Sequence, residues 1–301
     1  MPCLHSPVLV LLSTGVLALA CQSETEMTAL IIRRLLIDLD APLPRHWNGG
    51  DAFRTAFFNA LSMSFPVGEQ FFIDSVREGA KALPPPQQAR FEAEVKGFVG
   101  QEATHRRIHG LFNDQLARQG LVNRWAERAA RRIRRLRDLN VRHHVASTAA
   151  YEHFTAILAE HLLAHPEQWG EGTPERLKLM WEWHASEESE HKSTAFELYQ
   201  ALGGNHAWRV KWFRIVTVYF VMDTLRQTVN NLWHDRTWWR PSTWASAARF
   251  LFGRGGLVRD CYGPWRQYLR EDFHPDQQGT QRAAQWLHAH AGDYRVVGDA
   301  V

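Results

Sequence analysis

Two stretches of the chain each contain a Glu-x-x-His motif, and two others each place a single glutamate among apolar residues. Residues three apart on an α-helix project from the same face, so the carboxylate and imidazole of one motif can reach the same metal ion. Four carboxylates and two imidazoles are a ligand set that suits a pair of divalent metal ions. The six candidate metal ligands are Glu69, Glu102, His105, Glu152, Glu188 and His191.

The elements that carry these six residues are predicted to be amphipathic helices, because their apolar residues recur at alternating steps of four and three. The two motifs lie on expected helices over Pro85–Gln119 and Pro174–Leu202. The single glutamates lie on stretches 58–76 and 141–162, which have the same spacing. Pro66 should kink or start the first of these stretches, since proline removes a helix hydrogen bond.

The order of the candidate ligands predicts an internal repeat. Glu69 precedes Glu102 by 33 residues and Glu152 precedes Glu188 by 36, as counted along the sequence. Each half therefore supplies one Glu and then Glu-x-x-His, which is the ligand set of ferritin-like dimetal carboxylate bundles. We expect an all-α protein whose residues 27–204 form a ferritin-like four-helix bundle of two helix-pair repeats. Residues 205–301 should form a helical extension packed on the bundle.

Charge supports the metal interpretation. Four ionised carboxylates inside an apolar bundle would be strongly destabilising without counter-charge, whereas two divalent cations balance them. No Lys or Arg falls on the four predicted faces, and Arg106 is the nearest base in the sequence. Iron, as Fe/Fe or Mn/Fe, fits this oxygen-rich set better than zinc. His109 and His184 are expected either to support the ligands from outside or to add a nitrogen ligand.

Composition excludes several other classes of protein. The 35 Lys and Arg residues nearly balance the 32 Asp and Glu residues, so no nucleic-acid partner is expected. The basic stretch over residues 124–137 is interpreted as a solvated helix face. Three cysteines and no C-x-x-C motif leave neither a disulfide framework nor a thiolate zinc site.

The first 26 residues allow two interpretations. An apolar run over Val8–Ala20 ends beside Cys21, as in an exported lipoprotein, but no Lys or Arg precedes it. The alternative, which we favour, is that residues 1–26 are an upstream extension and that Met27 is the true start. That interpretation predicts a cytoplasmic protein.

With these residues in view, the chain resembles the bacterial predicted metal-dependent hydrolase family, a ferritin-like group. The resemblance starts near Met27 and runs nearly to the end, and it assigns the ligand roles to the same six positions. Asp276 stands where the family usually has Trp, far along the sequence from these positions. The matching stretches are Phe57–Ser62, Phe65–Phe72, Gln101–His105, Tyr151–Thr155, Trp183–Lys192, Leu251–Leu257 and Phe273–Pro275.

Three functions remain open at this stage. The resemblance implies hydrolysis, in which a metal pair lowers the pKa of bound water. The Glu-rich, His-poor ligand set instead favours O2-dependent oxidation of a lipophilic small molecule, with an external electron donor to reset the site. Ferritin-like iron binding or storage is the third hypothesis, and it involves no organic substrate.

The C-terminal extension is expected to contain a helix that could contact the substrate or a membrane. Its first predicted helix contains an apolar run bracketed by Arg214 and Asp223, which is too short to span a bilayer. This helix either covers the core, forms the wall of a substrate channel, or makes a peripheral contact with a membrane. The helices expected here are Trp208–Trp233, Trp238–Phe252 and Tyr262–Leu269.

Overall fold

The computed structural model describes residues 30–298 and confirms the all-α prediction, apart from one short two-stranded ribbon. The described residues form ten α-helices and two 3-10 turns. The predictions made for residues 1–26 fall outside the part of the chain that the structure describes. No helix within residues 30–298 combines the length and the apolar character needed to cross a bilayer.

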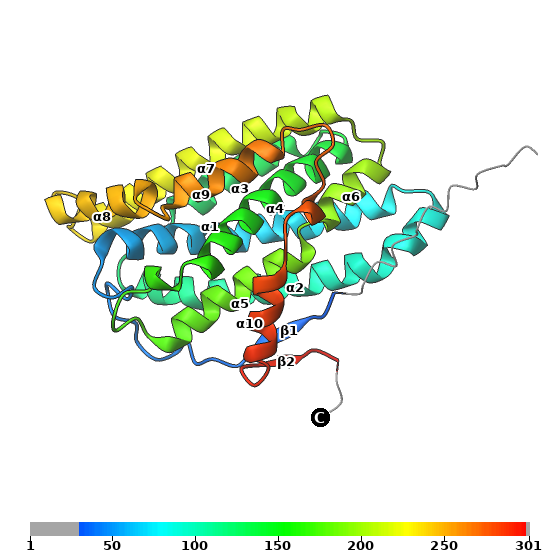
Figure 1. Ribbon diagram of the computed structural model, residues 1–301. Helices are drawn as coiled ribbons and strands as arrows, with labels where there is room; N and C mark the ends of the chain where they lie inside the picture. Colours follow the sequence, from blue (N-terminus) through cyan, green and yellow to red (C-terminus); the bar gives the residue numbers. More distant parts are fainter. Residues whose placement is uncertain (1–29, 299–301) are drawn as a thin grey trace, which may run out of the picture.

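Four long helices carry the candidate ligands. They are α1 (Ala52–Lys81), α2 (Pro85–Arg118), α4 (Val141–Ala164) and α5 (Glu175–His191). Helix α1 packs along α2, α4 packs along α5, and α1 also contacts α4 (Figure 1). Asp51 begins α1 and Asn140 begins α4, because each side chain accepts a hydrogen bond from a backbone N–H of the first turn.

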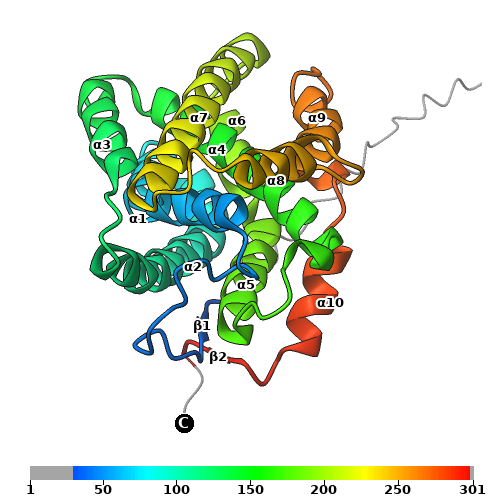
Figure 2. The ribbon, with the colours of Figure 1, turned by 90° about the vertical axis from the view of Figure 1, so that its left-hand side faces the viewer.

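The remaining elements surround these four helices. Strands β1 and β2 pair antiparallel, which joins the start of the described chain to its end. In both views α7, α8 and α9 lie on one side of the molecule, with α2, α10 and the ribbon on the other (Figures 1 and 2). These elements are β1 (Arg33–Leu35), α3 (Arg124–Leu136), η1 (Pro166–Gln168), α6 (Thr194–Ala201), α7 (His206–His234), α8 (Pro241–Phe252), α9 (Leu257–Gln267), η2 (Pro275–Gln277), α10 (Gln281–Ala289) and β2 (Tyr294–Val296).

Pro66 lies inside α1 and does not start it. A proline inside a helix leaves the carbonyl four residues earlier without its backbone donor. That carbonyl belongs to Ser62, and Asn113 of α2 donates its side-chain N–H to it at 2.9 Å. The helix therefore continues through the proline because a neighbouring helix supplies the missing hydrogen bond.

The helix predicted over Pro174–Leu202 is divided in two. Helix α5 ends at His191, and α6 begins at Thr194 after a turn at Lys192 and Ser193. The side chains of both turn residues bond to the segment around η2, Lys192 to the carbonyl of Gln278 and Ser193 to Asp276. These contacts with a segment about 85 residues away are invisible to a local pattern of apolar residues.

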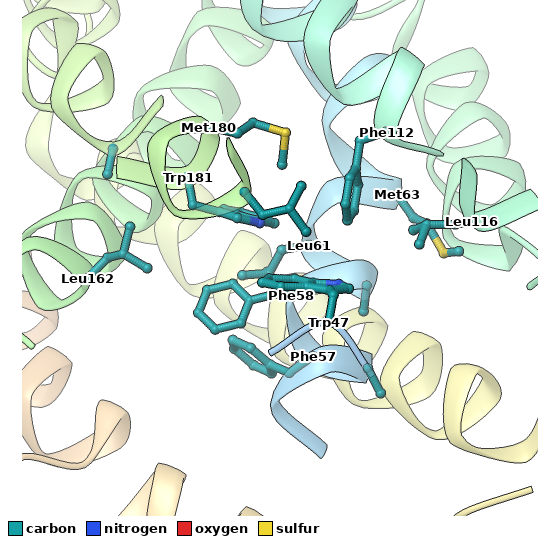
Figure 3. Close-up of a cluster of buried hydrophobic side chains, with 14 of the residues drawn as sticks. Trp47, Phe57, Phe58, Leu61, Met63, Phe112, Leu116, Leu162, Met180 and Trp181 are labelled. Atoms are coloured by element: carbon teal, nitrogen blue, oxygen red, sulfur yellow. The ribbon is translucent and has the colours of Figure 1, made fainter. Parts of the chain in front are cut away.

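A cluster of buried hydrophobic side chains, many of them aromatic, packs between α1, α2, α4 and α5 (Figure 3). Trp47, from the segment before α1, lies 6.0 Å from the rings of both Phe58 on α1 and Phe112 on α2. Its indole N–H donates to Asn59 at 2.8 Å, so its polar atom is satisfied while the ring is buried. Burying one such ring contributes about 2–3 kcal/mol.

Candidate metal centre

All six predicted ligands are buried, and each comes from one of the four long helices. Their residues are between 0% and 5% exposed. Glu69 comes from α1, Glu102 and His105 from α2, Glu152 from α4, and Glu188 and His191 from α5.

The structure brings the two Glu-x-x-His motifs together. Glu102, His105, Glu188 and His191 each offer one ligand atom, and these four atoms lie within 4.8 Å of one another. Glu152 joins this group through its Oε2, which lies 2.9 Å from Nδ1 of His191. The residue types and their mutual distances fit a site for a metal ion or a pair of ions.

Glu69 marks the other end of the cluster. Its carboxylate forms a second group with His105 and His184, again with one ligand atom of each within 4.8 Å of the others. His105 belongs to both groups, so the two groups are continuous. His184, predicted as either an outer support or an extra ligand, lies at this end of the cluster.

Many ligand atoms of the six residues have no hydrogen-bond partner among the described residues. Buried polar atoms are rarely left in this state, because each costs free energy. Their concentration on six converging side chains shows that these residues fit bound cations. The unpartnered atoms are both carboxylate oxygens of Glu69 and Glu102, Oε1 of Glu152, Oε2 of Glu188, Nδ1 of His105 and Nε2 of His191.

Burial and mutual repulsion make it unfavourable for all four carboxyl groups to be ionised at the same time. Burial, together with repulsion by neighbouring carboxylates, raises the pKa of Glu69 and of Glu102 well above the usual value. Burial raises the pKa of Glu152 to about 7, although His191 opposes this rise. Burial also opposes ionisation of Glu188, but His191, the imidazole of His105 at 3.5 Å and a hydrogen bond to His184 keep its pKa well below the usual value.

The pKa values of the two motif histidines are also raised, which favours the charged form of a histidine and not, as for a carboxyl group, the neutral form. Burial disfavours their charged forms, but hydrogen bonds and attraction to Glu187 and Glu188 raise the pKa of His105 to about 10. Attraction to Glu152 and Glu188 likewise raises the pKa of His191. Protons therefore neutralise the cluster when no metal is bound, and divalent cations would replace those protons.

An outer pair of charged residues, which the sequence pattern did not reveal, holds one histidine in place. Nε2 of His105 bonds to Oε2 of Glu187 at 2.9 Å, which leaves Nδ1 facing the cluster. Arg33 of β1 approaches Oε1 of Glu187 at 3.2 Å and Oε2 of Glu190 at 2.7 Å. The run Glu187, Glu188 and Glu190 is an acidic signal in the sequence, but Arg33 lies 154 residues away from Glu187.

A chain of hydrogen bonds leads from the cluster to the edge of α2. His184 bonds through Nε2 to Glu188 at 2.8 Å and through Nδ1 to His109 at 2.6 Å. Nδ1 of His109 contacts the hydroxyl of Ser62 at 2.9 Å, and that hydroxyl donates to half-buried Asn113 at 2.9 Å. Both nitrogens of His184 are thus engaged within the protein, as expected for an outer support.

Two apolar cavities share part of their lining, and the smaller one adjoins this end of the cluster. The smaller one, about 50 Å³, is lined by Glu188, His184 and aromatic side chains such as Phe58. The larger one, about 250 Å³, lies between α1, α3, α4 and α7. Both cavities share the same lining residues at their junction, Phe65, Thr155 and Phe220. Thr155 is one turn from Glu152.

Two other predictions about side chains can be compared with the structure. His153, which follows Glu152 in the sequence and was not among the predicted ligands, is buried away from the cluster and bonds to the carbonyl of Pro264 at 3.1 Å. The basic stretch forms α3, and much of its surface is exposed. Arg128 and Arg132, however, form ion pairs with buried Asp223 of α7, so this helix is tied to the C-terminal extension.

Comparison with known proteins agrees with the chemistry of the cluster. No curated protein and no solved structure matches this chain. A family model described as "Predicted metal-dependent hydrolase" matches residues 31–279, which include all six candidate ligands and their outer partners. The chain therefore belongs to the predicted metal-dependent hydrolase family.

Proposed function

We propose that this protein is a ferritin-like dimetal carboxylate enzyme that oxidises a lipophilic small molecule with O2. The six candidate ligands would hold two divalent ions, most suitably Fe/Fe or Mn/Fe, with Glu102 and Glu188 shared between them. The observation that carries the proposal is the set of unpartnered ligand atoms directly beside an apolar cavity. An external electron donor would restore the reduced state after each turnover.

The residues of the chain have separate parts in this proposal. A bound metal pair would supply activation of dioxygen or water. The aromatic lining of the smaller cavity excludes water from the region beside Glu188 and favours an apolar substrate. The Arg33–Glu187 pair orients His105, so that Nδ1 faces the cluster. Nε2 of His184 hydrogen-bonds to Glu188.

Hydrolysis is the second candidate, and the family description favours it. The same six residues would hold the metals, and the apolar cavities would receive the acyl or alkyl part of the substrate. No covalent nucleophile is needed for this reaction, because a metal-held water can attack directly. Oxidation ranks first because the six candidate ligands supply four carboxylates and only two imidazoles, an oxygen-rich set that suits iron.

Oxygen dependence separates the candidates without knowledge of the substrate. Protein loaded with iron, then reduced under argon, is mixed with buffer containing O2, and O2 consumption is recorded. We expect about one O2 consumed per pair of irons, and no such uptake by Glu188→Ala. Hydrolysis of p-nitrophenyl decanoate by the manganese-loaded protein, unchanged under argon and without O2 uptake, would support the second candidate. Uptake of many irons per chain would indicate storage instead.

A further inference from the structure

The C-terminal helices expose a concentration of large apolar side chains. Of the 19 exposed large hydrophobic residues among residues 30–298, 14 lie between Trp208 and Tyr262. Large exposed apolar patches on a folded protein mark an interaction with another surface. Five of the 14 are tryptophans, namely Trp208, Trp233, Trp238, Trp239 and Trp244.

Helix α7 arranges its exposed apolar residues in a stripe. Val218, Met222, Leu225, Val229 and Trp233 follow one another at steps of three or four, so they share one helix face. The opposite face of α7 packs on α1 and α4. The stripe covers about 22 Å at 1.5 Å per residue.

Helices α8 and α9 extend this apolar surface. Trp238 and Trp239 occupy the turn after α7, and the ring of Trp238 stacks on that of Trp233 at 5.1 Å. Trp244 and Phe252 on α8, and Tyr262 on α9, are also exposed. Helices α7, α8 and α9, which carry these residues, lie on the same side of the molecule in both views (Figures 1 and 2).

The charge of this region is strongly positive. Residues 206–259 contain nine Lys and Arg residues and two acidic residues, Asp223 and Asp235. Both acids are already neutralised, Asp223 by arginines of α3 and Asp235 by Arg45. Eight of the nine basic residues are exposed, namely Lys211, Arg214, Arg226, Arg236, Arg240, Arg249, Arg254 and Arg259.

We propose that the α7–α9 face, defined by these exposed apolar and basic residues, binds the surface of an anionic lipid bilayer. Tryptophan and tyrosine favour the interface between headgroups and acyl chains, and arginine and lysine favour anionic headgroups. A second copy of the chain is a poorer partner, because two identical positive faces would repel each other. Membrane docking extends the proposed function, since Ile215 and Tyr219 of α7 also line the larger cavity.

Sedimentation with lipid vesicles tests the proposal independently of any metal chemistry. The full chain is mixed with vesicles of phosphatidylcholine alone or of phosphatidylcholine with phosphatidylglycerol, and bound protein is measured. We expect binding to the anionic vesicles, weakened by added salt, and little binding to the neutral ones. Each arginine lost from the face should weaken binding about fivefold, so Arg226→Gln with Arg240→Gln should weaken it about 25-fold.

Matched variants separate the apolar contribution from a general loss of folding. Leu225→Glu with Val229→Glu should abolish vesicle binding while leaving metal content and circular dichroism unchanged. Val297→Glu, at a similarly exposed valine beside the ribbon on the other side, should leave vesicle binding unchanged.

Two results would overturn the proposal. One is equal binding to neutral and anionic vesicles, or no binding to either. The other is a stable dimer in light scattering that Leu225→Glu with Val229→Glu converts to monomer, which would assign the face to self-association. Failure of the oxidation assay would leave the lipid result unaffected, because vesicle binding requires no turnover.

Discussion

The two halves of the candidate centre have the same ligand types and different surroundings. In the first half, His105 is held from outside by Glu187, which Arg33 supports. The matched position to Glu187 in the first motif is Gln101, whose side chain bonds to Ile31 and Glu190 and not to His191. One histidine thus has a charged outer partner, while the other contacts only candidate ligands and apolar residues.

The residues one helix turn before the two motif glutamates also differ, since one is polar and the other is apolar. Four residues before Glu188 stands His184, which begins the hydrogen-bond chain towards Asn113. Four residues before Glu102 stands Phe98, whose ring lies 4.9 Å from that of His191. The cavity beside Glu188 also reaches His184. If the proposed function holds, we expect substrate and protons to approach from the side of His184 and Glu188, and Phe98 to close the opposite side.

The largest effect should come from the two carboxylates that the proposed function places between the metals, because they occupy equivalent positions in the two halves. Glu102→Ala and Glu188→Ala should each lose both metal ions, and activity should fall by more than the roughly 100-fold typical of losing an outer partner. Elemental analysis and the O2-uptake assay measure both effects. Full metal content in either variant would remove the basis for the ligand assignment.

The outer pair should affect one metal position and not the other. Glu187→Gln removes the charged acceptor of His105, and we expect one of two metal-binding steps to weaken by about 10- to 100-fold. Gln101→Leu, at the matched position, should leave both steps unchanged. Competitive titration with a chelating dye resolves the two steps, and equal weakening by both variants would show that the halves do not differ.

A substitution at His184 tests whether the difference between His184 and Phe98 matters for activity. His184→Phe places at this position the residue type found at Phe98, and it cuts the hydrogen-bond chain between Glu188 and His109. We expect two metals to remain bound while O2 uptake slows about 100-fold, the usual size of a proton-transfer contribution. Loss of one metal ion would instead identify His184 as an additional ligand.

The metal-free protein should lose stability as the pH rises from 6.5 to about 10. The pKa values of Glu152 (about 7) and His105 (about 10) in the folded protein lie above their ordinary values. Such groups bind more protons folded than unfolded, so rising pH removes their stabilisation. His184 and His109, whose pKa values burial lowers, act only below pH 6.5. Thermal melts of chelator-treated protein measure this, and metal loading should abolish the decline.

The smallest expected effect concerns Pro66, which lies inside α1 and has no counterpart inside α4. Asn113→Ala leaves the Ser62 carbonyl, freed by Pro66, without a donor, which should cost about 1–2 kcal/mol. A thermal melt should shift downward by a few degrees, whereas Asp114→Ala, an exposed neighbour on α2, should leave it unchanged. Equal melts for both variants would show that Asn113 does not support the proline.

Much of the cluster could be predicted because its information is local. The steps of three and four that place Glu102 with His105, and Glu188 with His191, are fixed within a single helix turn. The charge argument then required the four carboxylates to share counter-ions, and the structure does bring them together. The helices α2 and α7 also agree with the predicted ranges to within two residues at each end.

The features that escaped prediction all depend on contacts between distant segments. Arg33 reaches Glu187 only because β1 pairs with β2 at the other end of the chain. The break between His191 and Thr194 depends on bonds to the segment around η2. Asn113 keeps α1 continuous through Pro66 from a different helix. Periodicity reports which face is buried, and it carries no information on the partner that buries it.

Metal content per chain tests the central claim most directly. The protein is purified from cells supplemented with iron and manganese, and the metals are counted by elemental analysis beside Glu102→Ala. We predict about two ions per chain, as iron or as iron with manganese, and none in the variant. A wild-type protein without bound metal would contradict the account, because the six side chains would then be a polar core neutralised by protons alone.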